Sequence, residues 1–229
     1  MADPGTPDRY LAGRVALVTG ATRGVGRATA ARLHAAGAYV YLNYAHDDAQ
    51  AAATLAALDA VGGPGGAGLA RGDVTAPDTL PAVLERIGAE RGRLDVFVHN
   101  VSSLHPMQAT APDPHGVHAD LATALDPLLY GIGGLTKLLP PDGGRIVAVS
   151  SLGGRAVIPR YVSLGVAKAA LESLVRYLAV ELAGRGVTVN AVAGAKLDKG
   201  EPLAPHEQAL ADRAPAGRLA TPDDLADVV

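Results

Sequence analysis

The sequence predicts an α/β fold, a single domain built on a doubly wound parallel sheet with helices on both faces. Six short runs rich in apolar and β-branched residues are candidate strands, and alanine- and leucine-rich stretches with apolar residues at helical spacing lie between them. Parallel strands need a crossover connection, so this alternation favours a parallel sheet that is covered on both sides. The strands are expected at residues 15–19, 39–43, 69–73, 95–100, 145–150 and 187–192, and the helices at 24–36, 47–60, 77–91, 117–139 and 160–184.

Length and composition suit one soluble domain. The chain has 229 residues, of which 48% are hydrophobic and 19% charged, and its formal net charge is −3. These values predict neither disorder nor a nucleic-acid partner, and no stretch approaches the roughly 18 consecutive apolar residues that span a membrane. We therefore expect a cytoplasmic protein with a flexible segment at 1–12, a domain at 13–229, and surface turns at the Gly- and Pro-rich stretches 62–68 and 140–144.

Metal chemistry is not expected. The chain has no cysteine, which excludes disulfides, thiolate metal ligands and a cysteine nucleophile. The histidines lack the spacing of a zinc site, and although His115 and His118 are three residues apart, no carboxylate pattern supports them. A solvated surface is the better interpretation of this pair.

The first predicted strand runs into a glycine-rich turn that is typical of a dinucleotide site. Gly20, Gly24 and Gly26 form a Gly-x-x-x-Gly-x-Gly pattern between this strand and an alanine-rich helix. The first glycine permits the tight turn, the second lets the backbone approach a diphosphate, and the third lets helix and strand pack closely. Free N–H groups at the helix start attract phosphates. We therefore expect these glycines to bind the cofactor together with the residues between them, Thr22, Arg23 and Val25.

The end of the second predicted strand indicates which dinucleotide is bound. NAD-selective sites usually place an acidic residue there for the ribose hydroxyls, whereas this chain has Asn43 followed by Tyr44. Arg23 in the glycine-rich turn can meet a 2′-phosphate with paired hydrogen bonds. The sequence therefore predicts NADPH, with Asn43 beside it, and makes NADH the less favoured cofactor.

A serine, a tyrosine and a lysine after the fifth predicted strand are the candidate catalytic residues. Ser151 ends the strand, and Tyr161 and Lys168 are seven apart, so on a helix they return to nearly the same face, about 10 Å apart along the axis. An ammonium stabilises a tyrosinate, which makes the hydroxyl a better proton donor at neutral pH. The alternative is a solvated Tyr and Lys on an amphipathic helix, and the scarcity of lysine, four in the chain, argues against it.

These motifs resemble those of the short-chain dehydrogenase/reductase family over residues 13–229. The resemblance rests on TGATRGVG at 19–26, Asp73-Val74 after the third strand, VHNVSS at 98–103, IVAVSS at 146–151 and VNA at 189–191. It implies a Rossmann-like fold in which Asp73 contacts the adenine with Val74 beside it, Asn100 and Gly194 lie beside the cofactor, Tyr161 is the proton donor and Lys168 binds the ribose. It also implies a homotetramer or homodimer, a substrate lid at about 196–217, and a further strand beyond the helix that Thr221-Pro222 opens.

The spacing of the catalytic pair resembles one branch of this family. The commoner branch has Tyr-x3-Lys, which would place the tyrosine where this chain has Leu164, and its relay asparagine aligns with Ala124. The observed Tyr-x6-Lys is similar to NADPH-dependent enoyl-acyl-carrier-protein reductases. Moving the acid one helical turn, about 4.5 Å, suits conjugate reduction, because hydride then enters at the β-carbon, several bonds from the carbonyl oxygen.

The sequence therefore predicts an NADPH-dependent enzyme that reduces the C=C bond of an α,β-unsaturated acyl thioester, either as a small molecule or on a carrier protein. One alternative is a ketoreductase for a 3-oxoacyl or polyketide-type carbonyl, in which Ser151, Tyr161 and Lys168 act together. Ser151 supports this alternative, because enoyl reductases often have a second aromatic residue at its position. A third possibility is a protein that binds a nucleotide without catalysis, since a fold alone does not fix an activity.

Overall fold

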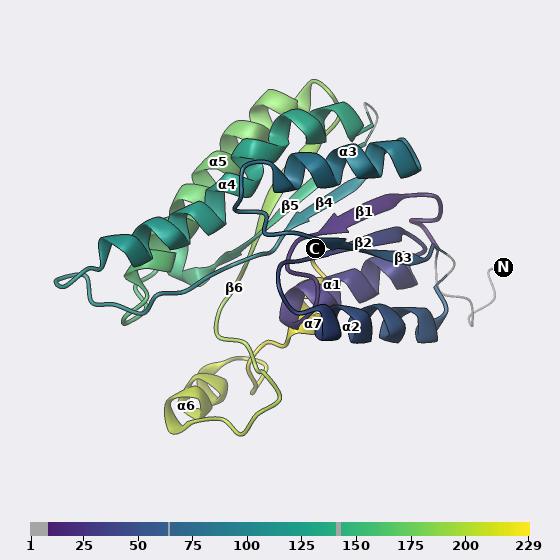
Figure 1. The fold of residues 1–229 in the computed structure, drawn as a ribbon. Helices are drawn as coiled ribbons and strands as arrows, with labels where there is room; N and C mark the ends of the chain where they lie inside the picture. Colours follow the sequence, from purple (N-terminus) through teal and green to yellow (C-terminus); the bar gives the residue numbers. More distant parts are fainter. Residues whose placement is uncertain (1–8, 64, 141–142) are drawn as a thin grey trace.

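The computed structural model describes residues 9–63, 65–140 and 143–229, and its six strands form one sheet in which all neighbours are parallel (Figure 1). Their order is β3-β2-β1-β4-β5-β6. The predicted α/β class, a doubly wound parallel sheet of Rossmann-like order, is confirmed. The strands are β1 (Val15–Val18), β2 (Tyr39–Tyr44), β3 (Ala67–Arg71), β4 (Val96–His99), β5 (Arg145–Ser151) and β6 (Thr188–Gly194).

Helices cover both faces of the sheet (Figure 1). One face carries α1 (Gly24–Ala35) and α2 (Asp48–Val61), and the other carries α3 (Thr79–Arg91), α4 (Pro114–Leu138) and α5 (Val162–Ala183). A short 3-10 helix, η1 (Leu152–Gly154), follows β5, and α7 (Pro222–Ala226) packs against α1. The remaining helix, α6 (Pro205–Arg213), stands apart from the sheet.

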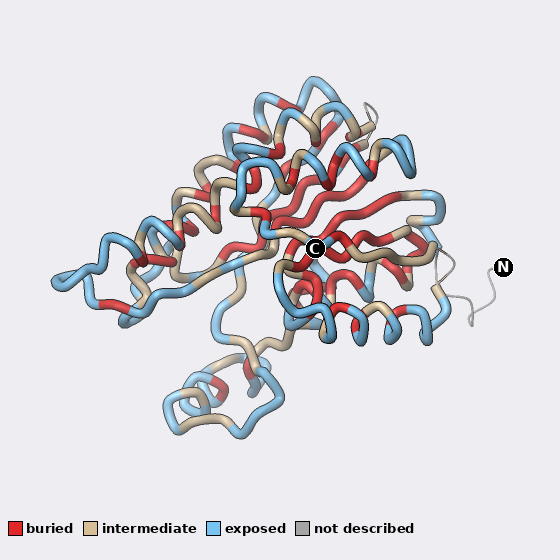
Figure 2. The backbone as a smooth tube through the Cα atoms, viewed as in Figure 1, coloured by how far each residue is buried: buried red, intermediate tan, exposed pale blue. Residues whose placement is uncertain are grey.

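Each face of the sheet has its own apolar core, and most strand residues are buried (Figure 2). Successive residues of a strand point to opposite faces. Ala16 and Val18 of β1 therefore pack with Leu58 of α2, whereas Leu17 between them packs with Leu128 of α4. Because two cores hold the same strands, the carboxyl ends of these strands are fixed in position.

The strand order reverses between β1 and β4, which are direct neighbours in the sheet. The chain leaving β1 crosses one face and the chain leaving β4 crosses the other, so a crevice forms between the two connections. Gly20 follows β1 and Asn100 follows β4. The glycine-rich turn therefore lies at the point of the sheet edge where ligands bind in folds of this kind.

Some elements begin or end elsewhere than predicted, for local reasons. α4 begins at Pro114 rather than 117, because the Asp113 carboxylate before it accepts hydrogen bonds from two N–H groups of the first turn. β3 covers Ala67–Arg71 rather than 69–73, since its pairing with β2 begins at Ala67 and Asp73 turns away in hydrogen bonds to Thr75. The helix predicted after Thr221 is α7.

The predicted substrate lid, residues 196–217, contains a helix. α6 begins after Ala204, whose N–H donates to the Glu207 carboxylate at 2.9 Å, and Glu207 also pairs with Lys196 at 2.6 Å. At the base of the lid, the N–H of Asp198 donates to the carbonyl oxygen of Ala220 at 2.8 Å. The chain before and after α6 is therefore joined at its base, while α6 extends away from the sheet (Figure 1). A role of this segment as a lid stays a prediction.

Residues 1–8, 64 and 141–142 lie outside the described part of the chain. The predicted flexible segment 1–12 and the turns at 62–68 and 140–144 are therefore described only in part. Leu11, near the end of that segment, donates its N–H to the carbonyl oxygen of Ala36 at 3.0 Å. Within the described residues, no helix is both long enough and apolar enough to cross a membrane.

Candidate active site

The glycine-rich turn after β1 has the shape that a diphosphate requires. Gly20 and Gly24 have φ values of +61° and +52°, which side chains disfavour. A Cβ on Gly26 would lie 2.2 Å from the carbonyl oxygen of Gly20, so only glycine lets α1 begin this close to the turn. A Cβ on Gly24 would meet no atom within 4 Å, so the backbone there is open to a ligand. The turn therefore fits a dinucleotide, whose phosphates the free N–H groups of the first turn of α1 would bind.

Side chains tie the turn to β4 and α2. Asn100 donates from Nδ2 to the carbonyl oxygens of Thr19 and Gly20 at 2.9 and 3.1 Å. Thr19 Oγ1 in return accepts from the N–H of Asn100 at 2.9 Å. On the other side, Thr54 of α2 donates to the carbonyl oxygen of Thr22 at 3.1 Å. The turn is therefore held in place by the protein itself, which lowers the ordering cost of binding.

The carboxylates that follow β2 already have partners. Asp47 caps α2 by accepting a hydrogen bond from a backbone N–H, and Asp48 accepts from the hydroxyl of Tyr44 at 2.8 Å. Arg23 is exposed at the start of α1. Arg23 is therefore available to a ligand at this end of the site, as the sequence predicts for a 2′-phosphate.

Three residues that are predicted to contact the cofactor also make contacts within the fold. Asn43 is buried and donates from Nδ2 to two carbonyl oxygens, one in β3 and one just after it, both at 3.0 Å. Val74 is buried in the core, so only its main chain is left to meet a ligand. Asp73 is exposed, and one of its carboxylate oxygens accepts from Thr75. Contact of these residues with the cofactor stays a prediction, and for Asn43 the amide group is already engaged.

The segment after β5 places Ser151 against Tyr161. The Tyr161 hydroxyl donates to Ser151 Oγ at 3.1 Å. Its ring lies on Gly153, where a Cβ would be 2.4 Å from a ring carbon. Arg160, just before it, is the one non-glycine residue with a positive φ, +61°, in the described chain. Tyr161 is the N-cap of α5 rather than a member of its first turn, so the strained residue and the glycine together set the direction of its ring.

Lys168 lies two turns farther along α5 and is 3% exposed. Its Nζ donates to the carbonyl oxygen of Val149 at 2.7 Å. Burial lowers the pKa of Lys168 to about 8, against an opposing effect of the Asp120 charge. Most of the molecules therefore keep the ammonium at pH 7. Leu164, which stands where the commoner family branch has its tyrosine, is buried in the core.

Eight of the fourteen predicted site residues line one pocket of about 340 Å³. The pocket combines the glycine-rich turn with the candidate acid and its cationic neighbour, as the sequence predicts for hydride transfer beside a bound dinucleotide. Gly24 instead lines a neighbouring cavity that shares Arg23. The predicted site residues that line the pocket are Gly20, Arg23, Val25, Asn100, Ser151, Tyr161, Lys168 and Gly194, and those that do not are Thr22, Gly24, Gly26, Asn43, Asp73 and Val74.

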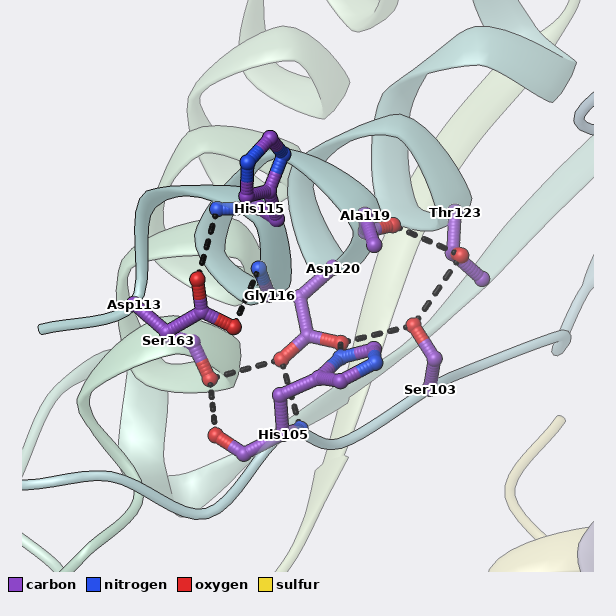
Figure 3. A network of polar contacts seen from close by, with 9 residues as sticks. All are labelled: Ser103, His105, Asp113, His115, Gly116, Ala119, Asp120, Thr123 and Ser163. Carbon is purple, nitrogen blue, oxygen red and sulfur yellow. Dashed lines mark hydrogen bonds and ion pairs between the residues drawn. The ribbon is translucent and has the colours of Figure 1, made fainter.

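A polar network around Asp120, which the sequence did not indicate, joins α4, α5 and the segment after β4 (Figure 3). The Asp120 carboxylate is fully buried and accepts from the hydroxyls of Ser103 and Ser163 at 2.7 and 2.6 Å, and from His105 Nδ1 at 2.8 Å. Burial raises the pKa of Asp120, but these hydrogen bonds outweigh it and the net pKa is lowered. Asp120 is therefore ionised at neutral pH. Asp120 lies four residues before Ala124 and therefore on the same face of the predicted helix, and this spacing is the sequence signal that could have found it.

His99 is a second buried group that the sequence analysis did not single out. Burial, together with the charge of Lys168, lowers the pKa of His99 to about 3, so the imidazole is neutral. Its Nε2 donates to the carbonyl oxygen of Ala124 at 2.9 Å. His99 therefore fixes the end of β4 against α4, directly before Asn100.

Among the described residues, no group of three or more His, Asp and Glu side chains is arranged to hold a metal ion. His115 and His118 are both exposed.

The chain is similar to known proteins both in sequence and in fold. A family model described as Enoyl-(Acyl carrier protein) reductase matches residues 20–229. The 1-cyclohexenylcarbonyl-CoA reductase of Streptomyces collinus is 37% identical over 223 residues, which cover 94% of this chain and 79% of that protein.

Solved structures extend the comparison to the fold. A dehydrogenase/reductase from Sinorhizobium meliloti superposes with a TM-score of 0.89 at 29% identity, covering 97% of this chain and 88% of that one. The landomycin C-6 ketoreductase LanV, solved with bound NADP and rabelomycin, has a TM-score of 0.84 at 30% identity and covers 96% and 88%. Matches of this length show that the chain belongs to the short-chain dehydrogenase/reductase family of oxidoreductases.

Proposed function

We propose that this oxidoreductase uses NADPH to reduce the C=C bond of an α,β-unsaturated acyl thioester. The observation that carries the proposal is the place of Tyr161, at the N-cap of α5 and two turns ahead of Lys168. The position one turn closer to Lys168 holds Leu164, which is buried in the core. The acid therefore stands about 4.5 Å farther along the helix than a Tyr-x3-Lys arrangement would place it. That displacement suits a substrate whose carbonyl oxygen is several bonds away from the carbon that accepts hydride.

The reaction named for one relative supports reduction of a C=C bond. The Streptomyces collinus protein is a reductase of 1-cyclohexenylcarbonyl-CoA, whose ring double bond is conjugated to a thioester carbonyl. The two sequences align over 94% of this chain. A substrate of the same chemical class, on coenzyme A or on a carrier protein, is therefore the first to test.

In this reaction, bound NADPH would supply the hydride. The Tyr161 hydroxyl, which donates to Ser151 Oγ in the structure, would donate instead to the thioester oxygen, where negative charge develops. Lys168 is buried with its ammonium largely retained at pH 7, so it stabilises that negative charge in a place that water screens poorly. Ser151 keeps the Tyr161 hydroxyl pointed toward the pocket before substrate arrives.

The choice of NADPH over NADH rests on Arg23 and on the engaged carboxylates after β2. Arg23→Ser should weaken NADPH binding by about tenfold or more, because a charge-assisted pair is lost, and should leave NADH binding within about twofold. Arg176→Ser, an exposed arginine on α5, is the matched control. Equal losses for both dinucleotides in Arg23→Ser would contradict the role in selectivity.

Ketone reduction is the second candidate, and one contact favours it. The 3.1 Å hydrogen bond between Tyr161 and Ser151 would let both hydroxyls bind one carbonyl oxygen, as direct reduction of a ketone requires. The similarity to a ketoreductase solved with NADP agrees with it. In this case hydride would enter at the carbon that carries the oxygen.

A direct competition tests the proposal. Purified protein with NADPH is offered a crotonyl thioester and a 3-oxoacyl thioester, and oxidation of NADPH is followed by absorbance. We expect the crotonyl substrate to react faster, and faster oxidation with the 3-oxoacyl substrate would transfer the assignment to ketone reduction. Tyr161→Phe should abolish either reaction while leaving NADPH binding within about twofold. Binding of NADPH with turnover of neither substrate would favour a protein that binds nucleotide without this catalysis.

A further inference from the structure

His105 lies on the segment that links two cavities lined by Tyr161. Val101, near the start of this segment, lines the pocket of about 340 Å³. Met107, near its end, lines a second cavity of about 450 Å³ and forms a β-bridge with Tyr161, which lines this cavity as well. His105 stands between Val101 and Met107, and 48% of its side chain is exposed. Its main chain is close to the start of α5, because Met107 pairs with Tyr161 and Ser163 Oγ lies 2.9 Å from the His105 carbonyl oxygen. About half of the His105 side chain is open to solvent.

The ring of His105 is held in one orientation (Figure 3). Nδ1 is 2.8 Å from an Asp120 oxygen, the N–H of His105 donates to the other oxygen at 3.1 Å, and Ser163 Oγ lies 2.9 Å from the His105 carbonyl oxygen. Because Asp120 is ionised, Nδ1 carries a hydrogen and Nε2 is the atom that can exchange a proton. A side chain anchored in this way is prepared for directed proton transfer.

Asp120 also connects this pair to the catalytic lysine. Its negative charge acts on Lys168 and raises the pKa of that ammonium against the effect of burial. The carboxylate therefore lies within electrostatic reach of Lys168 while it contacts His105 directly. The Asp120 carboxylate therefore acts on both His105 and Lys168.

The proposed reaction needs a proton that Tyr161 does not supply. Addition of hydride to the β-carbon moves the π electrons toward the carbonyl oxygen and leaves an enolate. Tyr161 hydrogen-bonds that oxygen, so its proton is not available to the α-carbon. The α-carbon takes its proton either from water or from a second acid. Among the described residues, His105 combines a fixed, half-exposed ring with a main chain close to the start of α5.

We propose that His105, positioned by Asp120, donates the proton to the α-carbon of the enolate. The proposal rests on the C=C reduction set out above. The N–H bond at Nε2 of the imidazolium breaks and a C–H bond forms at the α-carbon, while the enolate electrons provide the new bond and the C=O bond is restored. The neutral imidazole then regains a proton from water, and Asp120 remains ionised throughout. Hydride and proton together account for the two hydrogens added to the substrate.

Stereochemistry at the α-carbon is the measurement that separates proton transfer from a structural role. The protein, NADPH and crotonyl thioester are incubated in D₂O, and the product is analysed by NMR for deuterium at the α-carbon. Wild type should place one deuterium in a single configuration. His105→Gln should lower kcat about 100-fold, leave the KM for NADPH within about twofold, and give both configurations, because solvent then protonates either face.

Further variants make the test specific. Imidazole added to His105→Ala should restore a substantial part of the lost rate, whereas the matched control His115→Gln, an exposed histidine on α4, should behave as wild type. Asp120→Asn should also give mixed configurations. In ¹⁵N NMR of the protein without substrate, His105 should show hydrogen on Nδ1 in wild type and lose this preference in Asp120→Asn.

Different results would contradict the role of His105 and the proposed function. A single configuration and a kcat within threefold of wild type in His105→Gln would overturn the role of His105. A loss of rate that imidazole does not restore, with one configuration retained, would make His105 structural and overturn it too. Should His105→Gln fail to fold, a single configuration from Asp120→Asn would decide against the proposal. If the wild-type protein does not reduce the crotonyl thioester, the proposed function is wrong, and this inference is wrong with it.

Discussion

Substitution of Gly26 by alanine tests the dinucleotide site through one close contact. The added methyl carbon would lie 2.2 Å from the carbonyl oxygen of Gly20 and 2.5 Å from Asn100 Nδ2. A carbon and a carbonyl oxygen need about 3.3 Å, so α1 and the turn must separate by about 1 Å. Overpacking of this kind costs about 1–3 kcal/mol. It also strains the Asn100 hydrogen bonds that hold the turn.

We expect NADPH to bind about 30-fold more weakly to Gly26→Ala, which corresponds to about 2 kcal/mol. Titration calorimetry measures the Kd, and thermal unfolding measures stability. The matched control is Gly133→Ala in α4, where a Cβ meets no atom within 4 Å. That variant should bind NADPH as wild type does and unfold at a temperature about 2 °C higher, because alanine favours a helix over glycine. A Kd for Gly26→Ala within threefold of wild type, with unchanged stability, would refute the reasoning.

Three other perturbations probe separate parts of the structure. The reaction rate should fall as pH rises through about 8, because burial lowers the pKa of Lys168 to about 8 and deprotonation removes its charge; a flat rate profile from pH 7 to 9.5 would contradict this. Asp95 is buried, which raises its pKa, but hydrogen bonds from Arg93, the Val15 N–H and Arg14 outweigh that effect. Its contribution to stability is therefore present at neutral pH and lost as pH falls through its lowered pKa. Because Arg14 and Arg93 are partly exposed, Asp95→Asn should cost about 1–2 kcal/mol in denaturant unfolding at pH 7, and less in acid. Amide hydrogens of α6 should exchange more slowly with NADPH present, and equal protection in both states would count against a lid.

Much of the fold could be predicted because strand and helix patterns are local. The run VALV and the alternation around it were enough to place β1, and Thr221-Pro222 was enough to place α7. The ends of elements were less certain, since they depend on partners. β3 begins at Ala67 because β2 pairs there, and α4 begins at Pro114 because Asp113 caps it.

The candidate site, too, could be predicted from the sequence only in part. Gly20, Tyr161 and Lys168 stand in short motifs whose spacing has a physical meaning, so the sequence could single them out, and the structure brings them to one pocket. Asn43 could not be judged from the sequence, because its amide donates to one carbonyl group in β3 and one just after it, and β3 lies beside Asn43 only in the folded sheet. The roles of these residues in catalysis and cofactor binding await the experiments above.

The parallel α/β class, the dinucleotide turn and the seven-residue spacing of Tyr161 and Lys168 can be predicted from the amino-acid chain, because each shows in local patterns of residues. The network in which the buried Asp120 joins Ser103, His105 and Ser163 exists only in the folded protein. These four residues come from two helices and a connecting segment, and no local pattern links them. Hydrogen bonds between distant segments form only once the sheet and its helices have packed, so the acid–base environment of the site is a property of the fold.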